Sequence, residues 1–380
     1  MRRQRRQVIS PGRNSLLQTE VGRVTRVERV RPGAQELRVM VGDREERAVN
    51  YTQLLGEVRV NEVVLLNTTA VRARLGTGGY HFVMKRAEEP PRQEAGPGHI
   101  VKLRYTPLQF RCLSVEELES PYRGAIEDCR DLEEMPIVVA GLHSQIAPAA
   151  AAVKALAPEA KIAYVMTDTA ALPISFSRLV TDLKAAGLLD ATITVGQAFG
   201  GDYEAVNVFT GLLAARAVVG AQVAIVAQGP GNVGTETEFG FGSISQGDHI
   251  NAAATLGGLP IAVPRISFAD PRPRHRGVSR QSLVVLGQVV LVSAVVSVPQ
   301  MAPEKLEAVQ RQLDDEGITK RHEVLLARGE IGVDALRERG IDVKTMGRSM
   351  EEDPEFFLAA GAAGAIAAER LRWTQSSLSD

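Results

Sequence analysis

Hydrophobic and polar residues alternate with a period of two along the first part of the chain, from about residue 20 to residue 86. The runs Leu37-Arg-Val-Met-Val41 and Tyr80-His-Phe-Val-Met84 and the region 58–66 are rich in apolar residues, and turns containing Gly or Asn separate them. Alternation is typical of strands with one buried face, and several short strands joined by regular turns favour a barrel. The sequence therefore predicts a small all-β, barrel-like domain over residues 20–105.

The pattern changes near residue 136, where short apolar runs begin to alternate with stretches of helical periodicity. Such alternation favours a mostly parallel, doubly wound (Rossmann-like) α/β sheet. We expect an α/β ligand-binding domain over residues 136–373, joined to the barrel by a connecting segment at residues 106–135. A helix is predicted to open at Gly200-Gly-Asp202. The predicted strands are residues 136–140, 161–166, 191–195, 222–228, 260–263, 289–296, 322–326 and 341–345.

The strand Gln222–Gln228 runs directly into the loop Gly229-Pro-Gly-Asn-Val-Gly234. This spacing formally matches G-x-G-x-x-G, but Gly240 and Gly242 delay the helix that a dinucleotide site requires, and Asp248 comes too early to be its acidic partner. A loop that holds a phosphate or a carboxylate with its backbone N–H groups fits better than a nicotinamide or flavin site. A long turn whose glycines only supply positive φ is the structural alternative.

Polar residues follow successive predicted strands and are expected to share the edge of the sheet where ligands bind, beyond the carboxyl ends of the strands. The candidate catalytic residues are His143, Asp168 and His275, because an imidazole titrates near neutral pH and a carboxylate can act as a base or orient a histidine. The candidate ligand-binding residues are Gly229, Gly231, Asn232, Gly234, Thr235, Gln197, Asp202, Asp270, Arg272 and Arg274.

The glycine-rich loop and the segment Asp270-Pro-Arg-Pro-Arg-His-Arg276 follow strands that are consecutive in the sequence. Consecutive strands are often neighbours in a sheet, so we expect the N–H groups of residues 231–235 to face the arginines and to form an anion site. Glu236 and Glu238 oppose this interpretation because carboxylates repel an anion. The alternative is that the arginines form salt bridges with these glutamates and that nothing binds.

Metal binding and nucleophilic catalysis have less support. Ser144 lies beside His143 without the G-x-S-x-G pattern of a nucleophile elbow. No H-x-x-x-H or H-x-H spacing supports a metal site, so the sequence assigns neither a metal nor a cofactor. The side chains of the right type for a divalent metal are those of His143, Asp168, Asp202, Asp270 and His275.

Composition narrows the classes of partner. The chain has 380 residues, a formal net charge of -1 and only 4% aromatic residues, which makes nucleic acid an unlikely partner. Cys112 and Cys129 form no C-x-x-C pair, so we expect a reduced, cytoplasmic setting. The apolar run at residues 283–298 falls short of the ~20 residues that span a bilayer, so no membrane is expected. Met1-Arg-Arg-Gln-Arg-Arg6 has no following apolar run, and residues 1–19 are predicted to be a basic disordered tail.

Five runs resemble segments of an uncharacterised bacterial family described only as a domain of unknown function: Gly141-Leu-His-Ser-Gln-Ile-Ala-Pro148, Tyr164-Val-Met-Thr-Asp-Thr-Ala-Ala-Leu-Pro173, Gly229-Pro-Gly-Asn-Val-Gly-Thr235, Asp270-Pro-Arg-Pro-Arg-His-Arg-Gly-Val-Ser279 and Leu75-Gly-Thr-Gly-Gly-Tyr-His-Phe-Val83. The resemblance extends roughly from residue 20 to residue 370. It implies no activity and transfers no catalytic residue, and adds only that these segments belong to one type of protein.

Three functions are compatible with these patterns. The first is a cytoplasmic enzyme that acts on a small anionic metabolite, for example a phosphorylated one, at the rim of the parallel sheet. The second is a non-catalytic ligand-sensing or regulatory protein whose barrel docks a partner. The third, with less support, is RNA binding through the barrel and the arginine-rich tail. The substrate and the state of oligomerisation, including a homo-oligomer, are left open by the sequence.

Overall fold

The computed structural model describes residues 17–75, 78–87 and 97–377 of the chain. The predicted basic tail therefore lies almost wholly outside the described residues. The chain divides into two compact units, residues 1–94 and residues 95–380, which we describe separately. The domain boundaries expected at residues 105 and 136 stay a prediction.

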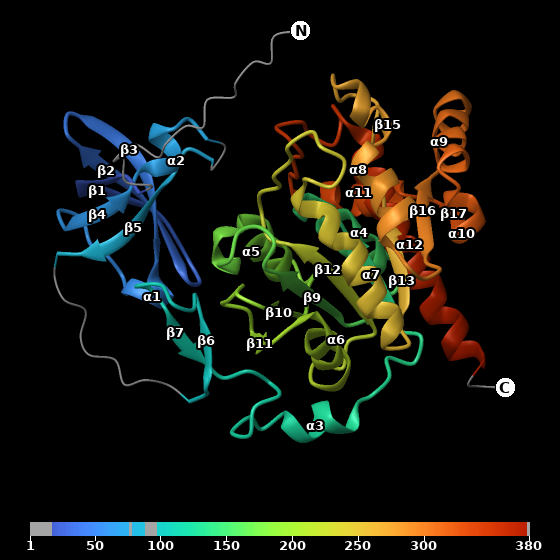
Figure 1. Cartoon of the computed structure of the whole chain (residues 1–380), viewed down its shortest axis with the longest axis horizontal. Helices are drawn as coiled ribbons and strands as arrows, with labels where there is room; N and C mark the ends of the chain where they lie inside the picture. Colours follow the sequence, from blue (N-terminus) through green and yellow to red (C-terminus); the bar gives the residue numbers. More distant parts are fainter. Residues whose placement is uncertain (1–16, 76–77, 88–96, 378–380) are drawn as a thin grey trace, which may run out of the picture. The chain divides into compact units, whose positions relative to one another are not determined.

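The first unit is a closed five-stranded barrel with strand order β1-β2-β3-β5-β4 (Figure 1). The β3–β5 pair is parallel, and the other four pairs are antiparallel. The barrel predicted from the alternating pattern is therefore confirmed. Its elements are β1 (Thr19–Arg31), β2 (Ala34–Val41), β3 (Arg44–Tyr51), α1 (Thr52–Leu55), β4 (Val63–Asn67), α2 (Thr69–Arg72) and β5 (His81–Arg86).

The second unit contains an eight-stranded sheet in which every strand pair is parallel, with strand order β11-β10-β9-β12-β8-β13-β16-β17 (Figure 1). Together with the helices on both faces, this confirms the Rossmann-like fold class. The strands are β8 (Pro136–Ala140), β9 (Ile162–Thr167), β10 (Ala191–Val195), β11 (Tyr203–Ala205), β12 (Val223–Gln228), β13 (Leu259–Val263), β16 (Val295–Pro299) and β17 (Glu323–Ala327).

The helices cover both faces of this sheet. The larger ones are α4 (Ile146–Leu156), α5 (Arg178–Ala185), α6 (Val208–Ala217), α7 (Ser245–Thr255), α9 (Pro303–Asp315), α11 (Glu330–Glu338) and α12 (Pro354–Ser377). Shorter elements are the β6–β7 hairpin (Ile100–Lys102 and Phe110–Cys112), α3 (Arg123–Asp128), the two-stranded β14–β15 sheet (Ile266–Ser267 and Gly277–Val278), α8 (Arg280–Val284), which continues as a π-helix over Val285–Val289, and α10 (Ile318–Arg321). No helix among the described residues is long and apolar enough to cross a membrane.

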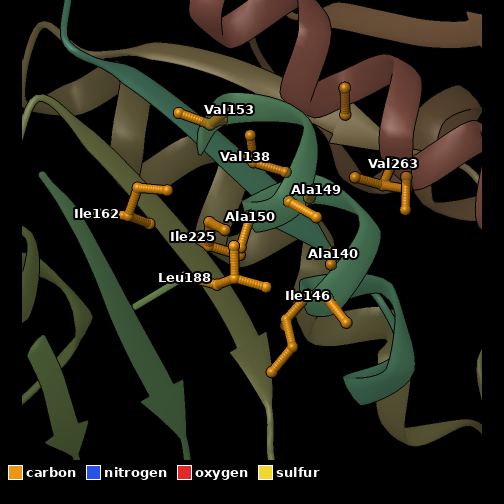
Figure 2. Packing of buried hydrophobic residues seen from close by; sticks show 14 of the residues in the cluster. Val138, Ala140, Ile146, Ala149, Ala150, Val153, Ile162, Leu188, Ile225 and Val263 are labelled. Atoms are coloured by element: carbon orange, nitrogen blue, oxygen red, sulfur yellow. The ribbon is translucent and has the colours of Figure 1, made fainter. Parts of the chain in front are cut away.

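The core of the sheet is buried on both faces, as parallel sheets require. Every residue of β8, β9, β10 and β12 is buried. On one face, Ile146, Ala150 and Val153 of α4 pack with Val138 and Ile225 of the strands (Figure 2). The other face is covered by α6, α7 and α8. Because both faces are covered by helices, polar side chains lie mainly in the loops at the ends of the strands.

Two predicted elements are wrong, and a third is displaced: residues 285–289 form a π-helix, and the strand expected at residues 289–296 is β16 at Val295–Pro299. Gly200-Gly-Asp202 does not open a helix: the chain turns and adds β11 beside β10, and a side chain at Gly201 would come within 2.9 Å of the Thr194 backbone nitrogen. The predicted strand 341–345 is also absent. Ile341 and Val343 are buried, as in a strand, but they pack in the helical core that covers the sheet, whose edge strand on that side is β17.

Close contact between helices depends on glycines of α11 and α12. A Cβ at Gly364 of α12 would lie 2.2 Å from the carbonyl oxygen of Ala149 in α4. A Cβ at Gly332 of α11 would lie 2.2 Å from the carbonyl oxygen of Pro148. The absence of side chains here lets the backbones of these helices approach each other.

Gly364→Ala should therefore destabilise the protein by roughly 1–3 kcal/mol, because overpacking outweighs the higher helix propensity of alanine. Gly124→Ala in α3 is the matched control, since its Cβ would meet no atom within 4 Å. Urea unfolding of both variants measures the difference. An equal or higher stability of Gly364→Ala would contradict the packing described.

Candidate functional site

The carboxyl ends of the parallel strands form one edge of the sheet, from which the polar loops extend. The expectation that the strands ending at Gln228 and Val263 are neighbours is wrong, because β8 lies between β12 and β13 and pairs with both. After β8 the chain enters α4 on one face, whereas after β12 it enters α7 on the other. A reversal of this kind opens a crevice beyond the strand ends.

A cavity of about 510 Å³ lies at this edge. It is bounded mainly by the glycine loop (residues 229–242) and the arginine loop (residues 264–276), so the two loops meet even though their strands are not neighbours. The lining residues are Leu142, Asn232, Val233, Gly234, Glu236, Thr237, Glu238, Arg265, Arg272, Arg274, His275, Arg280, Gln281 and Met346.

Two ion pairs join the walls of the cavity. Arg274 lies 2.8 Å from Glu236, and Arg280 lies 3.1 Å from Glu238. All four side chains are 40–70% exposed, from 40% for Arg274 to 70% for Glu236. The salt bridges of the alternative interpretation are therefore present, but exposed pairs of this kind contribute only about 0–1 kcal/mol to stability.

The glycine loop is tied to itself by side chains. Asn232 Oδ1 accepts hydrogen bonds from the Ser243 backbone N–H at 2.9 Å and from Gln228 Nε2 at 3.3 Å. Gly229 passes so close to the segment after β9 that a Cβ would lie 2.4 Å from the Ala171 carbonyl oxygen. Gly231 has a φ of 97°. These residues give the loop its shape, and of the predicted loop residues Asn232 and Gly234 line the cavity.

Backbone strain is present on the cavity wall. Glu236 and Met346 both line the cavity, and both have positive φ, at 67° and 50°. This conformation costs a non-glycine residue free energy, and such residues cluster at binding and active sites. Met346 is also 66% exposed, so an apolar side chain stands at the opening.

Asp270 holds the arginine loop in place rather than lining the cavity. Its buried carboxylate accepts two hydrogen bonds from the Arg272 side chain, at 2.9 and 2.8 Å, and one from Arg265 at 2.6 Å. Arg348 approaches it at 3.4 Å. The hydrogen bonds from Arg272 keep the pKa of Asp270 well below its usual range. This network fixes two of the arginines that face the cavity.

Arg265 is the buried cation of the site, and sequence reasoning missed it. The residue is only 7% exposed, it lines the cavity, and its Nε has no hydrogen-bond partner among the described residues. Burial lowers its pKa. A buried guanidinium with an unused donor is costly unless something accepts the hydrogen bond, and Arg265 is a lining residue of this cavity.

His275 is the predicted catalytic residue that lines the cavity. Its Nδ1 lies 2.7 Å from the Ser279 hydroxyl oxygen. Burial, reinforced by Arg265 and Arg272, lowers the pKa of His275 to about 4. The ring is therefore neutral at pH 7 and can accept or donate one hydrogen bond in the cavity.

His143 does not line the cavity. Its Nε2 lies 2.6 Å from Ser177 Oγ, and its Nδ1 lies 3.2 Å from both the Tyr164 hydroxyl and the Gln228 carbonyl oxygen. Burial lowers its pKa to about 4. Both ring nitrogens are engaged by the protein, and Ser177 also accepts a hydrogen bond from the Val180 N–H at the start of α5. His143, which follows β8, thus links Tyr164 of β9 and the end of β12 to the start of α5.

Asp168, Gln197 and Asp202 lie elsewhere on the rim. Asp168 accepts a hydrogen bond from the Gln197 N–H at 2.8 Å, and Asp202 pairs with Lys184 at 2.5 Å. Gln197 lines a separate cavity of about 290 Å³ beside Arg104. The predicted rim residues therefore fall into two groups. No group of three or more His, Cys, Asp or Glu side chains in the described part of the chain is arranged to hold a metal.

A family model described as "Protein of unknown function (DUF3866)" matches residues 47–364. The match confirms the resemblance to a family of unknown function and covers part of the barrel and most of the α/β unit. No curated protein matches the chain.

Asp270→Asn should destabilise the protein by about 3–5 kcal/mol, because it leaves arginines of a buried network without their counter-charge. Glu236→Gln is the control of the opposite kind, since it removes an exposed carboxylate and should cost less than about 1 kcal/mol. Chemical unfolding measures both. Similar effects of the two substitutions would contradict the structural role of Asp270.

Acidification should destabilise the protein through its neutral histidines. The pKa values of His143, His249 and His275 fall to about 4 in the folded state, from about 6.5 in an unfolded chain. The unfolded chain therefore binds protons first, and stability is lost as the pH falls from about 6.5 to about 4, at up to about 1.4 kcal/mol per pH unit for each histidine.

Urea unfolding between pH 7 and pH 5 tests this expectation. His249 is 8% exposed, so His249→Gln should reduce the loss of stability between these pH values by a measurable fraction. An unchanged pH dependence in the variant would show that His249 does not titrate as described.

Proposed function

The chain belongs to the DUF3866 family of proteins of unknown function, and we propose that its α/β unit binds a small anionic metabolite in the cavity between the glycine loop and the arginine loop. The observation that carries the proposal is the buried Arg265, whose Nε faces no acceptor of the protein among the described residues. Arg272, Arg274 and Arg280 line the same cavity. A phosphate or carboxylate group accepts hydrogen bonds from several guanidinium groups at once.

Arg274 pairs with the exposed Glu236, which an anion can replace, whereas Arg280 pairs with both Glu238 and the less exposed Glu316. Their ion pairs with Glu236 and Glu238 are exposed and contribute little to stability. Arg265 and Arg272 differ, because the buried Asp270 holds them in position. We infer that Arg265 and Arg272 form the fixed part of the anion site. Arg274 and Arg280 then close over the bound ligand.

His275 is the residue to which we assign proton transfer if the protein is an enzyme. Its neutral ring lines the cavity, with Nδ1 engaged by Ser279. The other ring nitrogen, Nε2, is the atom that would exchange a proton with a bound metabolite. His143 and Asp168 are proposed to act on the shape of the rim, because both ring nitrogens of His143 and one carboxylate oxygen of Asp168 are engaged by the protein.

A non-catalytic, ligand-sensing role is the second candidate. It is favoured by the finding that one of the three predicted catalytic residues, His275, lines the cavity, while His143 and Asp168 do not. Native mass spectrometry of freshly purified protein, followed by incubation with whatever anion co-purifies, distinguishes the two roles. Chemical change of that anion supports an enzyme, and stable binding without change supports a sensor. We place either role in the cytoplasm, which two free cysteines support.

Arg274→Ala should weaken binding of inorganic phosphate and of citrate by about 1.5–3 kcal/mol, because it removes a charge-assisted hydrogen bond. The free energy of unfolding should change by less than about 1 kcal/mol, since the Glu236 pair is exposed. Isothermal titration with each anion measures the affinity. Arg311→Ala is the matched control, because Arg311 forms an exposed pair with Glu307 on α9, outside the cavity.

Glu236→Gln separates the proposal from its alternative. If Arg274 binds the anion, removal of the competing carboxylate should leave the affinity equal or higher. If Arg274 serves only to hold Glu236, neither substitution will alter anion binding. Failure of both phosphate and citrate to bind the unsubstituted protein, with no anion co-purifying, would refute the site.

A further inference from the structure

Charge is divided unevenly between the two units. The formal net charge of the chain is -1, but residues 1–94 carry 18 lysine and arginine residues against 11 aspartate and glutamate residues, a net charge of +7. Residues 95–380 therefore carry a net charge of -8. A strongly basic segment within a neutral chain is typical of proteins that bind polyanions.

The barrel has the strand arrangement of an OB-fold. Its order is β1-β2-β3-β5-β4, the first three strands form a meander, and β3 pairs in parallel with β5. Barrels of this type bind oligonucleotides or oligosaccharides on the face around strands 2 and 3 and on the loop between strands 4 and 5. The arrangement alone assigns no ligand, so the side chains of this face decide.

Irregularities in β1 place three arginines on one outer face. The β1–β2 register shifts between Val24 and Arg26 and again between Val27 and Arg29. The shifts let every third residue point outward, so Arg23, Arg26 and Arg29 pair with Met40, Arg38 and Glu36, while Val24 and Val27 pair with the buried Val39 and Leu37. A regular strand would have turned Arg26 towards the core.

Arg38 and Arg47 extend this row across β2 and β3, where they are directly paired. The Arg47 guanidinium lies 4.5 Å from the centre of the Tyr80 ring and donates a hydrogen bond to the Gly78 carbonyl oxygen at 2.7 Å. The loop before β5 is thus attached to the same face. Three carboxylates lie on the same face. Glu28 forms an ion pair with Arg38 at 2.8 Å, the buried Glu36 lies opposite Arg29, and Glu45 lies opposite Met40.

We propose that this arginine face, formed by Arg23, Arg26, Arg29, Arg38 and Arg47 with Tyr80 beside them, binds single-stranded nucleic acid. The arginines follow the phosphate backbone, and the partly exposed Tyr80 offers a ring on which a base stacks. RNA and DNA single strands share this chemistry. The proposal reverses the expectation from the net charge of the whole chain, and it is independent of the anion cavity in the other unit.

Fluorescence anisotropy of the full-length protein with labelled oligo(U) RNA and oligo(dT) DNA of 20 nucleotides, at several salt concentrations, tests the proposal. Both strands should bind, and the tighter one identifies the natural class. Arg26→Gln with Arg29→Gln should weaken binding about tenfold or more. The slope of log affinity against log salt should become shallower by about 1.4, which is ~0.7 for each lost phosphate contact with a single strand.

A matched control removes two charges elsewhere. Lys85→Gln on β5, a strand that pairs with neither β1 nor β2, combined with Arg311→Gln in the other unit, should leave affinity and slope nearly unchanged. A second control replaces Arg2, Arg3, Arg5 and Arg6 with Gln. Thermal unfolding should be the same in all variants, because Arg26 and Arg29 are exposed.

Three results would overturn the proposal. The first is no binding of either single strand at 50 mM salt. The second is equal weakening of binding by the Arg26→Gln, Arg29→Gln variant and by the Lys85→Gln, Arg311→Gln control, which would assign the effect to general charge. Loss of binding only in the variant without Arg2, Arg3, Arg5 and Arg6 would likewise assign the effect to the N-terminal tail. The third is equally tight binding of a 20-base-pair duplex, which would mark the face as a general polyanion surface.

Discussion

The structure depends on one constraint, which is that the central strands of the parallel sheet are buried on both faces. Burial on both sides requires apolar strands and a helical layer on each face, so polar chemistry is restricted to the ends of the strands. The position of β8 then decides where the site forms. Its chain leaves towards one face while the chains of its two neighbours leave towards the other, and the cavity lies where these paths separate.

Much of this architecture could be predicted because the periodicity of apolar residues reports burial directly. The period of two marked the barrel, and the alternation of strands and helices marked the parallel sheet. The order of the strands could not be predicted, since sequence adjacency does not show that β8 inserts between β12 and β13. The network that fixes the arginines of the site could not be predicted either. Asp270 contacts Arg348, which is 78 residues away in the sequence, and no pattern near Arg265 indicates that it is buried.

The acidic residues in the cavity do not exclude an anion, because an exposed salt bridge contributes less free energy than a charge-assisted hydrogen bond to a ligand. An exposed pair such as Arg274–Glu236 contributes about 0–1 kcal/mol, whereas a charge-assisted hydrogen bond to a desolvated group contributes about 1.5–3 kcal/mol. A ligand can therefore displace the carboxylate at little cost. The pairs of the buried Asp270 cannot be exchanged in this way, since a charge left unpaired there would cost several kcal/mol.

A net charge near zero limits the partners of a chain only when its charges are evenly mixed. Here the net charges of the two units nearly cancel when they are added. A ligand, however, meets only the electrostatic potential of nearby charges, because the Debye length at physiological salt is only about 8 Å. The barrel can therefore attract a polyanion although the chain as a whole is slightly acidic. The proposed anion site lies in the acidic unit, because four arginines line one cavity there. Under both proposals, the arrangement of the arginines, rather than their number, determines what can bind.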